Sequence, residues 1–162
     1  MNYNQFFSDA VNRLHDERRY RVFADLERIA GRFPHATWHS PNGERPVVMW
    51  CSNDYLGMGQ HPKVVGAMVE TATRVGTGAG GTRNIAGNHH PLVGLERELA
   101  DLHGKEAALV FTSGYVSNDA TLATLYKVLP GLIVFSDAFN HNSMIAGIRH
   151  GGGAKHVYRH ND

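Results

Sequence analysis

The spacing of apolar residues divides the chain into two parts. In residues 6–29, apolar side chains recur at roughly helical intervals among many charged residues, which predicts one or two amphipathic helices. Residues 34–46 hold three prolines and an Asn-Gly pair, which predict a turn-rich connector. Residues 1–46 are therefore expected to form an N-terminal helical segment with its connector, ahead of the main domain at residues 47–162.

The second part is predicted to begin with a short strand and two helices. The apolar run at residues 47–51 is typical of a strand. Pro62 opens a segment whose apolar face extends to Val75, and Pro91 opens a leucine-lined segment that ends near residue 103. Proline suits the first turn of a helix, where its missing N–H group is not needed.

From residue 107 onward the pattern alternates between strands and helices. The strands are expected at 107–112, 132–135 and 156–158, and the helices at 116–128 and 143–150. Two consecutive βαβ units predict a parallel α/β sheet. Such a sheet needs helices on both faces, and this sequence supplies few of them. We therefore expect the chain to be a piece of a larger protein.

Composition narrows the function classes. The 162 residues are 42% apolar and 19% charged, as in an ordinary globular protein, and the net charge of +1 gives no reason to expect nucleic acid or membrane binding. The single cysteine, Cys51, permits no internal disulfide and fits a reducing compartment. No run resembles a signal peptide or a membrane span, and the histidines show no metal-ligand spacing. We expect a cytoplasmic protein without a metal site.

Two candidate sites follow predicted strands, where ligands bind in parallel α/β sheets. The turn at residues 112–115 precedes a helix, whose N-terminal N–H groups suit a phosphate. The alternative is a plain turn with a serine cap. Residues 136–141 follow the next strand and end in His141, which suits an acid, a base or a stacking platform. The alternative there is a solvated loop histidine.

The third candidate is the glycine-rich stretch at residues 76–84. It matches the dinucleotide pattern G-x-G-x-x-G, but it follows a helix instead of a strand, and we reject that interpretation. The lysine of a phosphate-binding Walker loop is also missing. What remains is a loop carrying Thr82, Arg83 and Asn84, which could hold a carboxylate, or a linker that tolerates left-handed backbone angles.

Five blocks of the sequence, in order and spacing, closely resemble the α-oxoamine synthase family of pyridoxal 5'-phosphate (PLP) enzymes. They are residues 50–58, 76–87, 95–105, 111–115 and 136–145. The resemblance covers the whole chain and is to the member that condenses glycine with succinyl-CoA, releasing CoA and carbon dioxide, as the first step of tetrapyrrole (heme) synthesis. It implies an acyltransferase of fold type I, of which this chain is the N-terminal portion of the large, mostly parallel-sheet domain.

The resemblance also implies roles for single residues in a homodimer whose active sites lie at the subunit interface. It implies that Gly114 and Tyr115 contact the cofactor phosphate. It also implies that His141 stacks on the pyridine ring as a catalytic residue. Substrate contacts are implied for Asn53 (glycine carboxylate), for Arg21, Thr82 and Asn84 (succinyl carboxylate, the last two across the interface), and for Ser136 and Lys155.

The resemblance has one important gap. In the family, the lysine that holds the cofactor, the aspartate that pairs with the pyridine nitrogen and the arginine that binds glycine come later in the chain. None of the four lysines in this sequence matches that lysine motif, so we expect the chain to be inactive by itself. Two alternatives stay open: a related synthase that uses a different acyl-CoA, and a non-catalytic α/β fragment. The two polar groups and the cation at residues 82, 84 and 21 favour a short dicarboxylic acyl group over an alkyl chain.

Overall fold

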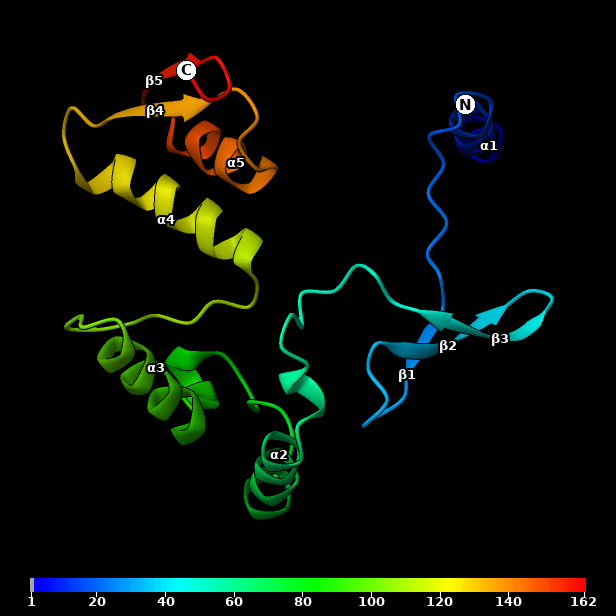
Figure 1. The fold of residues 1–162 in the computed structure, drawn as a ribbon. Coiled ribbons are helices and arrows are strands. Elements are labelled where there is room, and N and C mark those ends of the chain that lie inside the picture. Colours follow the sequence, from blue (N-terminus) through cyan, green and yellow to red (C-terminus); the bar gives the residue numbers. More distant parts are fainter. Residues whose placement is uncertain (1) are drawn as a thin grey trace. The chain divides into compact units, whose positions relative to one another are not determined.

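The computed structural model describes residues 2–162, and its contacts divide after Thr77 into two compact units. The first unit contains α1 (Tyr3–Asp16), β1 (Leu26–Arg28), β2 (His35–Ser40), β3 (Gly43–Val48) and α2 (Pro62–Val75). The second contains α3 (His90–Leu102), α4 (Gly114–Val128), β4 (Ile133–Asp137), α5 (Asn142–Gly151) and β5 (Ala154–Tyr158). Figure 1 shows these elements in chain order, and each unit is described by itself. The boundary that we expect between residues 46 and 47 concerns the domains of the complete fold and stays a prediction.

The helix expected over residues 6–29 is right only for its first part. Helix α1 begins after Asn2, whose side chain accepts a hydrogen bond from the N–H of Gln5, and it ends at Asp16. The expectation is wrong for residues 26–28, which form β1 and pair antiparallel with β2. Pairing with a strand distant in the sequence outweighs the local helical spacing of these residues.

The connector expected at residues 34–46 is also wrong, because these residues form most of a β-hairpin. Strands β2 and β3 pair antiparallel from His35 opposite Val48 to Ser40 opposite Gly43. The Ser40 hydroxyl closes the turn by donating to the Gly43 carbonyl at 2.6 Å. A tight two-residue loop of this kind is a common way to connect antiparallel strands. Pro46 is tolerated because β3 is an edge strand of the three-stranded sheet.

The remaining expectations for the first unit are confirmed in part. The strand expected at residues 47–51 is present only as far as Val48, where β3 ends. Helix α2 has the expected bounds, with Pro62 in its first turn and the His61 ring nitrogen Nδ1 accepting from the N–H of Lys63. No helix among residues 2–162 is both long and apolar enough to span a membrane.

In the second unit, the α/β pattern is confirmed over its later elements. Strands β4 and β5 pair in parallel, with Ile133 opposite Ala154 and Asp137 opposite Tyr158, and α5 connects them. Helices α3, α4 and α5 form where the sequence predicts them. The strand expected at residues 107–112 is absent, because no other strand pairs with this segment within residues 2–162. A buried strand needs a hydrogen-bonding neighbour on at least one edge.

The best-packed part of the second unit is the contact between α4 and α5, which lie side by side (Figure 1). Gly147 of α5 makes this approach possible, because a Cβ atom there would lie 2.8 Å from the carbonyl oxygen of Asp119. Ile148 and Ser143 of α5 are buried, with exposed fractions of 3% and 0%. Helix α4 begins within the candidate block 112–115, and α5 begins just after the block 136–141, so this contact fixes the two parts of the candidate site relative to each other.

Candidate functional site

His141 immediately precedes α5 and caps it with its ring. Its Nδ1 atom lies 3.2 Å from the backbone nitrogen of Ser143 and 2.6 Å from the Ser143 hydroxyl oxygen. A backbone N–H can only donate, so Nδ1 accepts and the neutral ring carries its proton on Nε2. The Ser143 hydroxyl accepts from the Asn118 amide at 3.0 Å and donates its own proton to His141. Asn118 and Ser143 thus orient the ring from α4 and α5.

Tyr115, in the first turn of α4, lies beside the same ring. The ring centroids of Tyr115 and His141 are 6.3 Å apart, and their planes meet at 72°, an edge-to-face arrangement. The Asn142 amide also donates to the Tyr115 hydroxyl at 3.2 Å. The structure therefore brings together the two sequence blocks, residues 112–115 and 136–141, that we identified separately as candidate sites.

The N-terminus of α4 has free hydrogen-bond donors. Ser113 caps the helix by accepting from the N–H of Val116. Within residues 2–162, the N–H groups of Gly114 and Tyr115 have no protein acceptor. A Cβ atom at Gly114 would meet nothing within 4 Å, so a ligand can approach the backbone closely. Two free N–H groups at the positive end of a helix form a suitable cradle for a phosphate group.

Ser136 and Lys155 come from neighbouring strands, at the end of β4 and in β5. Ser136 is buried, and its hydroxyl accepts from the Asn140 amide at 2.9 Å. Both residues line a small cavity of about 100 Å³ together with Asp137 and apolar side chains of α5, of β5 and of the loop after β4. The structure thus brings together two of the predicted substrate contacts, one hydroxyl and one cation.

Asp137 holds the loops that leave these two strands. Its carboxylate accepts from the N–H of Phe139 at 2.7 Å, from His160 Nδ1 at 3.0 Å and from the N–H of Asn161 at 3.2 Å. The Phe139 N–H first, and then the His160 ring, keep the pKa of Asp137 below its ordinary value. Asp137 therefore fixes the path of the loop that leads from β4 to His141.

Thr82 and Asn84 lie at a single π-helical turn, Arg83–Gly87, which follows the glycine-rich stretch. Both are exposed and flank the half-buried Arg83. Among residues 2–162, no hydrogen bond or ion pair joins this turn to the cluster around His141. The structure does not bring these two groups of predicted site residues into contact.

Arg21 and Asn53 belong to the first unit, and both are exposed. Arg21 follows α1 in an irregular segment and lines an open cavity with Leu14, Arg18, Arg19 and Tyr20. Within residues 2–162, neither Arg21 nor Asn53 makes a side-chain hydrogen bond or ion pair. Their side chains are therefore available to a ligand and have no structural partner to lose.

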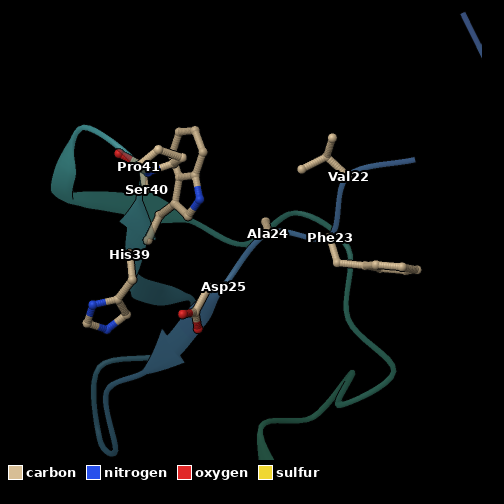
Figure 2. Close-up of a pocket in the computed structure, with 8 residues that line it drawn as sticks. Val22, Phe23, Ala24, Asp25, His39, Ser40 and Pro41 are labelled. Carbon is tan, nitrogen blue, oxygen red and sulfur yellow. The ribbon is translucent and has the colours of Figure 1, made fainter. Parts of the chain in front are cut away.

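The first unit also has a cavity of about 510 Å³ that sequence reasoning missed (Figure 2). Residues 22–25 and 38–41 line it, and the Phe23 side chain is 91% exposed. Nearby, His39 Nε2 lies 2.8 Å from a Glu27 carboxylate oxygen, and this hydrogen bond is the main cause of the raised pKa of His39. Of the polar side chains that line the cavity, His39 is paired with Glu27 and Glu44 across the sheet, so few free polar groups converge there as they would in a reaction site.

Sequence reasoning also missed the partners of His141. Asn118 lies within α4, and Ser143 lies within the first turn of α5, where small polar residues are ordinary. In the sequence, each is marked only by being a polar residue in a helix that the α/β pattern already predicts to pack against another element. Their separation of 25 positions in the sequence makes that signal too weak to use without the structure.

Comparisons with known proteins agree with this geometry. Residues 45–162 match the model of the family described as aminotransferase class I and II. The whole chain is 75% identical to the 5-aminolevulinate synthase of Bradyrhizobium diazoefficiens and 58% identical to 5-aminolevulinate synthase 1 of Cereibacter sphaeroides. In each case the chain spans 40% of the relative's length.

The fold is also similar to that of a solved structure. The serine palmitoyltransferase of S. paucimobilis, with a bound PLP–myriocin aldimine, is 25% identical and superimposes with a TM-score of 0.79. That match covers 100% of this chain and 40% of the other. The fold and the family model agree, and this chain belongs to the class I and II aminotransferase family.

Proposed function

We propose that this chain supplies the N-terminal part of a 5-aminolevulinate synthase, a PLP-dependent acyltransferase that condenses glycine with succinyl-CoA and releases CoA and carbon dioxide. One observation supports this proposal most strongly. The α4 N-terminus, with N–H groups that are unpaired within residues 2–162, lies beside the oriented His141 ring in the loop after β4. The 75% identity to the Bradyrhizobium diazoefficiens enzyme over the whole chain supports this choice of reaction. We place the reaction in heme biosynthesis and the enzyme in the cytoplasm.

The residues of the second unit suit PLP. The N–H groups of Gly114 and Tyr115 would hold the cofactor phosphate, because both are free and lie at a helix N-terminus. His141 would stack on the pyridine ring, with its own ring fixed by Ser143. When bound, PLP acts as an electron sink for the bond changes at the glycine carbon.

His141 has a defined protonation pattern in this site. Because Nδ1 accepts from Ser143, the proton on Nε2 is available for donation on the opposite edge of the ring. The edge-to-face contact with Tyr115 limits rotation of the ring about its side-chain bonds. His141 would therefore present a flat face and a single donor in a constant orientation.

Substrate binding would use the residues that the family resemblance implies. Asn53 would hold the glycine carboxylate, and Ser136 and Lys155 would offer a hydroxyl and a cation to the substrates. Arg21, Thr82 and Asn84 would hold the succinyl carboxylate. We propose that Thr82 and Asn84 do so across the interface of a homodimer, whose active sites combine residues of two subunits.

The main alternative is a related synthase with another acyl-CoA. The fold likeness to serine palmitoyltransferase favours it, but that likeness comes with 25% identity, against 75% for the 5-aminolevulinate synthase. A carboxylate-binding set of one cation and two polar groups would have no partner on an alkyl chain, so it favours a short dicarboxylic acyl group.

The proposal is tested in a completed enzyme, in which these 162 residues are continued by the rest of the Bradyrhizobium diazoefficiens sequence. The purified enzyme is assayed with glycine, PLP and a series of acyl-CoA substrates. We expect formation of 5-aminolevulinate from succinyl-CoA, with palmitoyl-CoA a far poorer substrate. A folded, PLP-containing enzyme that prefers an alkyl acyl-CoA would support the alternative.

A further inference from the structure

An ion pair that plays no part in the function described above ties the Thr82–Asn84 segment to α3. The Arg83 guanidinium donates two parallel hydrogen bonds to the Glu96 carboxylate, at 2.5 Å from Nη1 and 2.8 Å from Nη2. Bidentate pairs of this kind fix geometry as well as adding energy. The Glu96 side chain is only 13% exposed and that of Arg83 36% exposed, so this pair is better shielded than an ordinary surface ion pair.

Both partners make further contacts that lock the pair in place. Glu96 also accepts from the backbone N–H of Val110 at 2.8 Å, and Arg83 donates to the Asn88 side chain at 2.8 and 3.1 Å. Hydrogen bonds from Arg83 first, and then from Val110, lower the pKa of Glu96 to about 2. Glu96 is therefore a carboxylate at neutral pH, held by two different segments of the chain.

The turn that carries Arg83 is closed on itself. The N–H groups of Ile85 and Gly87 both donate to the Thr82 carbonyl, at 3.0 and 2.8 Å. Gly87 is buried, and a Cβ atom there would collide with the Gly81 carbonyl group. Residues 82–87 therefore form one rigid piece, whose orientation depends on what holds it from outside.

The glycine-rich segment before this turn does not fix the orientation of the turn. Gly76, Gly78 and Gly80 all have left-handed φ angles, and a Cβ atom at any of them would meet open space. Such a glycine-rich segment is conformationally permissive. The Arg83–Glu96 pair is the ion pair that anchors the turn among the described residues, and Arg83 stands between the two exposed side chains, Thr82 and Asn84.

We infer that Glu96, acting through Arg83, is a positioning residue that holds Thr82 and Asn84 in the orientation needed to bind the terminal carboxylate of the acyl-CoA. This inference rests on the proposed function. Glu96 does not touch the substrate itself. It fixes the backbone from which the two binding side chains project, and a displacement of about 1 Å in such a group is enough to cost up to a hundredfold in efficiency.

The test compares Glu96→Gln with the matched control Glu98→Gln in the completed enzyme. Glu98 lies on the same helix, is exposed and makes no ion pair within residues 2–162. We measure kcat/KM for succinyl-CoA and for butyryl-CoA, which lacks the terminal carboxylate. Glu96→Gln should lower the succinyl to butyryl preference by about tenfold to a hundredfold, with the KM for glycine and the PLP affinity unchanged, and Glu98→Gln should change none of them.

The results separate positioning from general damage. An equal loss for both acyl-CoA substrates, or an unchanged preference, would overturn the inference. If Glu96→Gln does not fold, Arg83→Lys serves instead, because it keeps the charge and loses the bidentate geometry; the same loss of preference is expected. If the unmodified completed enzyme fails to use succinyl-CoA, the proposed function fails, whatever the variants do.

Discussion

The backbone N–H of Ser143 lies in hydrogen-bonding position 3.2 Å from Nδ1 of His141, which fixes that nitrogen as an acceptor. The relationship joins the cap of α5 to the chemistry of the candidate site. The ring that caps the N-terminus of α5 is also the ring that would face the cofactor. Its orientation and its tautomer are therefore properties of the fold, set before any ligand binds.

The buried Ser143 hydroxyl should contribute to PLP binding, because it holds the His141 ring in place. We expect Ser143→Ala in the completed enzyme to loosen the His141 ring and weaken PLP binding, while the backbone cap remains. Each of the two lost hydrogen bonds, to His141 and from Asn118, should cost about 0.5–1.5 kcal/mol of stability. Histidine ring ¹⁵N chemical shifts check the tautomer directly. Unchanged PLP affinity, with His141 protonated on Nδ1 in the unmodified enzyme, would contradict this account.

The close approach of α4 and α5 predicts a packing defect. In Gly147→Ala, the new methyl group would lie 2.8 Å from the Asp119 carbonyl oxygen and 2.9 Å from the Leu122 Cβ atom. Overpacking of this kind costs about 1–3 kcal/mol. Gly66→Ala in α2 is the matched control, because its methyl group would meet nothing within 4 Å. Thermal unfolding should show a lower midpoint for Gly147→Ala only; equal midpoints would mean that the helices can separate freely.

His39 should make the three-stranded sheet sensitive to pH. Its hydrogen bond to Glu27 and the nearby Glu44 raise its pKa above 6.5. A raised folded-state pKa stabilises the fold fully below pH 6.5, and that contribution is lost as the pH rises through the folded value. Between pH 6 and pH 8, at about 0.15 M salt, the unfolding midpoint should therefore fall more in the unmodified completed enzyme than in His39→Gln. Identical pH profiles would show that the pair contributes nothing to stability.

Arg21 offers a clean test of substrate binding, because it has no protein partner within residues 2–162. Arg21→Ala should raise the KM for succinyl-CoA by roughly tenfold to a hundredfold, the loss expected for a charge-assisted contact of about 1.5–3 kcal/mol. The KM for glycine should stay nearly constant. Arg19→Ala, which removes only a surface pair with Glu17, is the control. Equal effects on both substrates would make Arg21 a structural residue.

The sequence predicted the second unit better than the first, for a physical reason. Helices α3 to α5 are local structures, set by apolar spacing, prolines and caps that lie within one segment. The β2–β3 hairpin depends on pairing between strands, and Pro46 argued against a strand unless its edge position was known. The run at residues 107–112 has the composition of a buried strand, but composition does not supply a neighbour to pair with.

The candidate site shows the same division. The residues near His141 and Gly114 could be found from the sequence, because both lie at the start of a predicted helix, although only the His141 loop follows a strand in the structure. The direction of the His141 ring could not, since it depends on Asn118 and Ser143, which the chain brings together from two helices. The Arg83–Glu96 pair also escaped notice, because charged residues 13 positions apart carry no local pattern.

The central claim is that PLP binds where α4 and α5 begin, with its ring on His141. Spectral titration of the completed enzyme and of His141→Ala with PLP tests this claim most directly, with circular dichroism as the control for folding. We predict that His141→Ala remains folded, binds PLP more weakly and shifts the cofactor's absorbance maximum, because the ring loses its face contact. An unchanged absorbance spectrum together with an unchanged affinity would contradict the claim and leave His141 as a helix cap only.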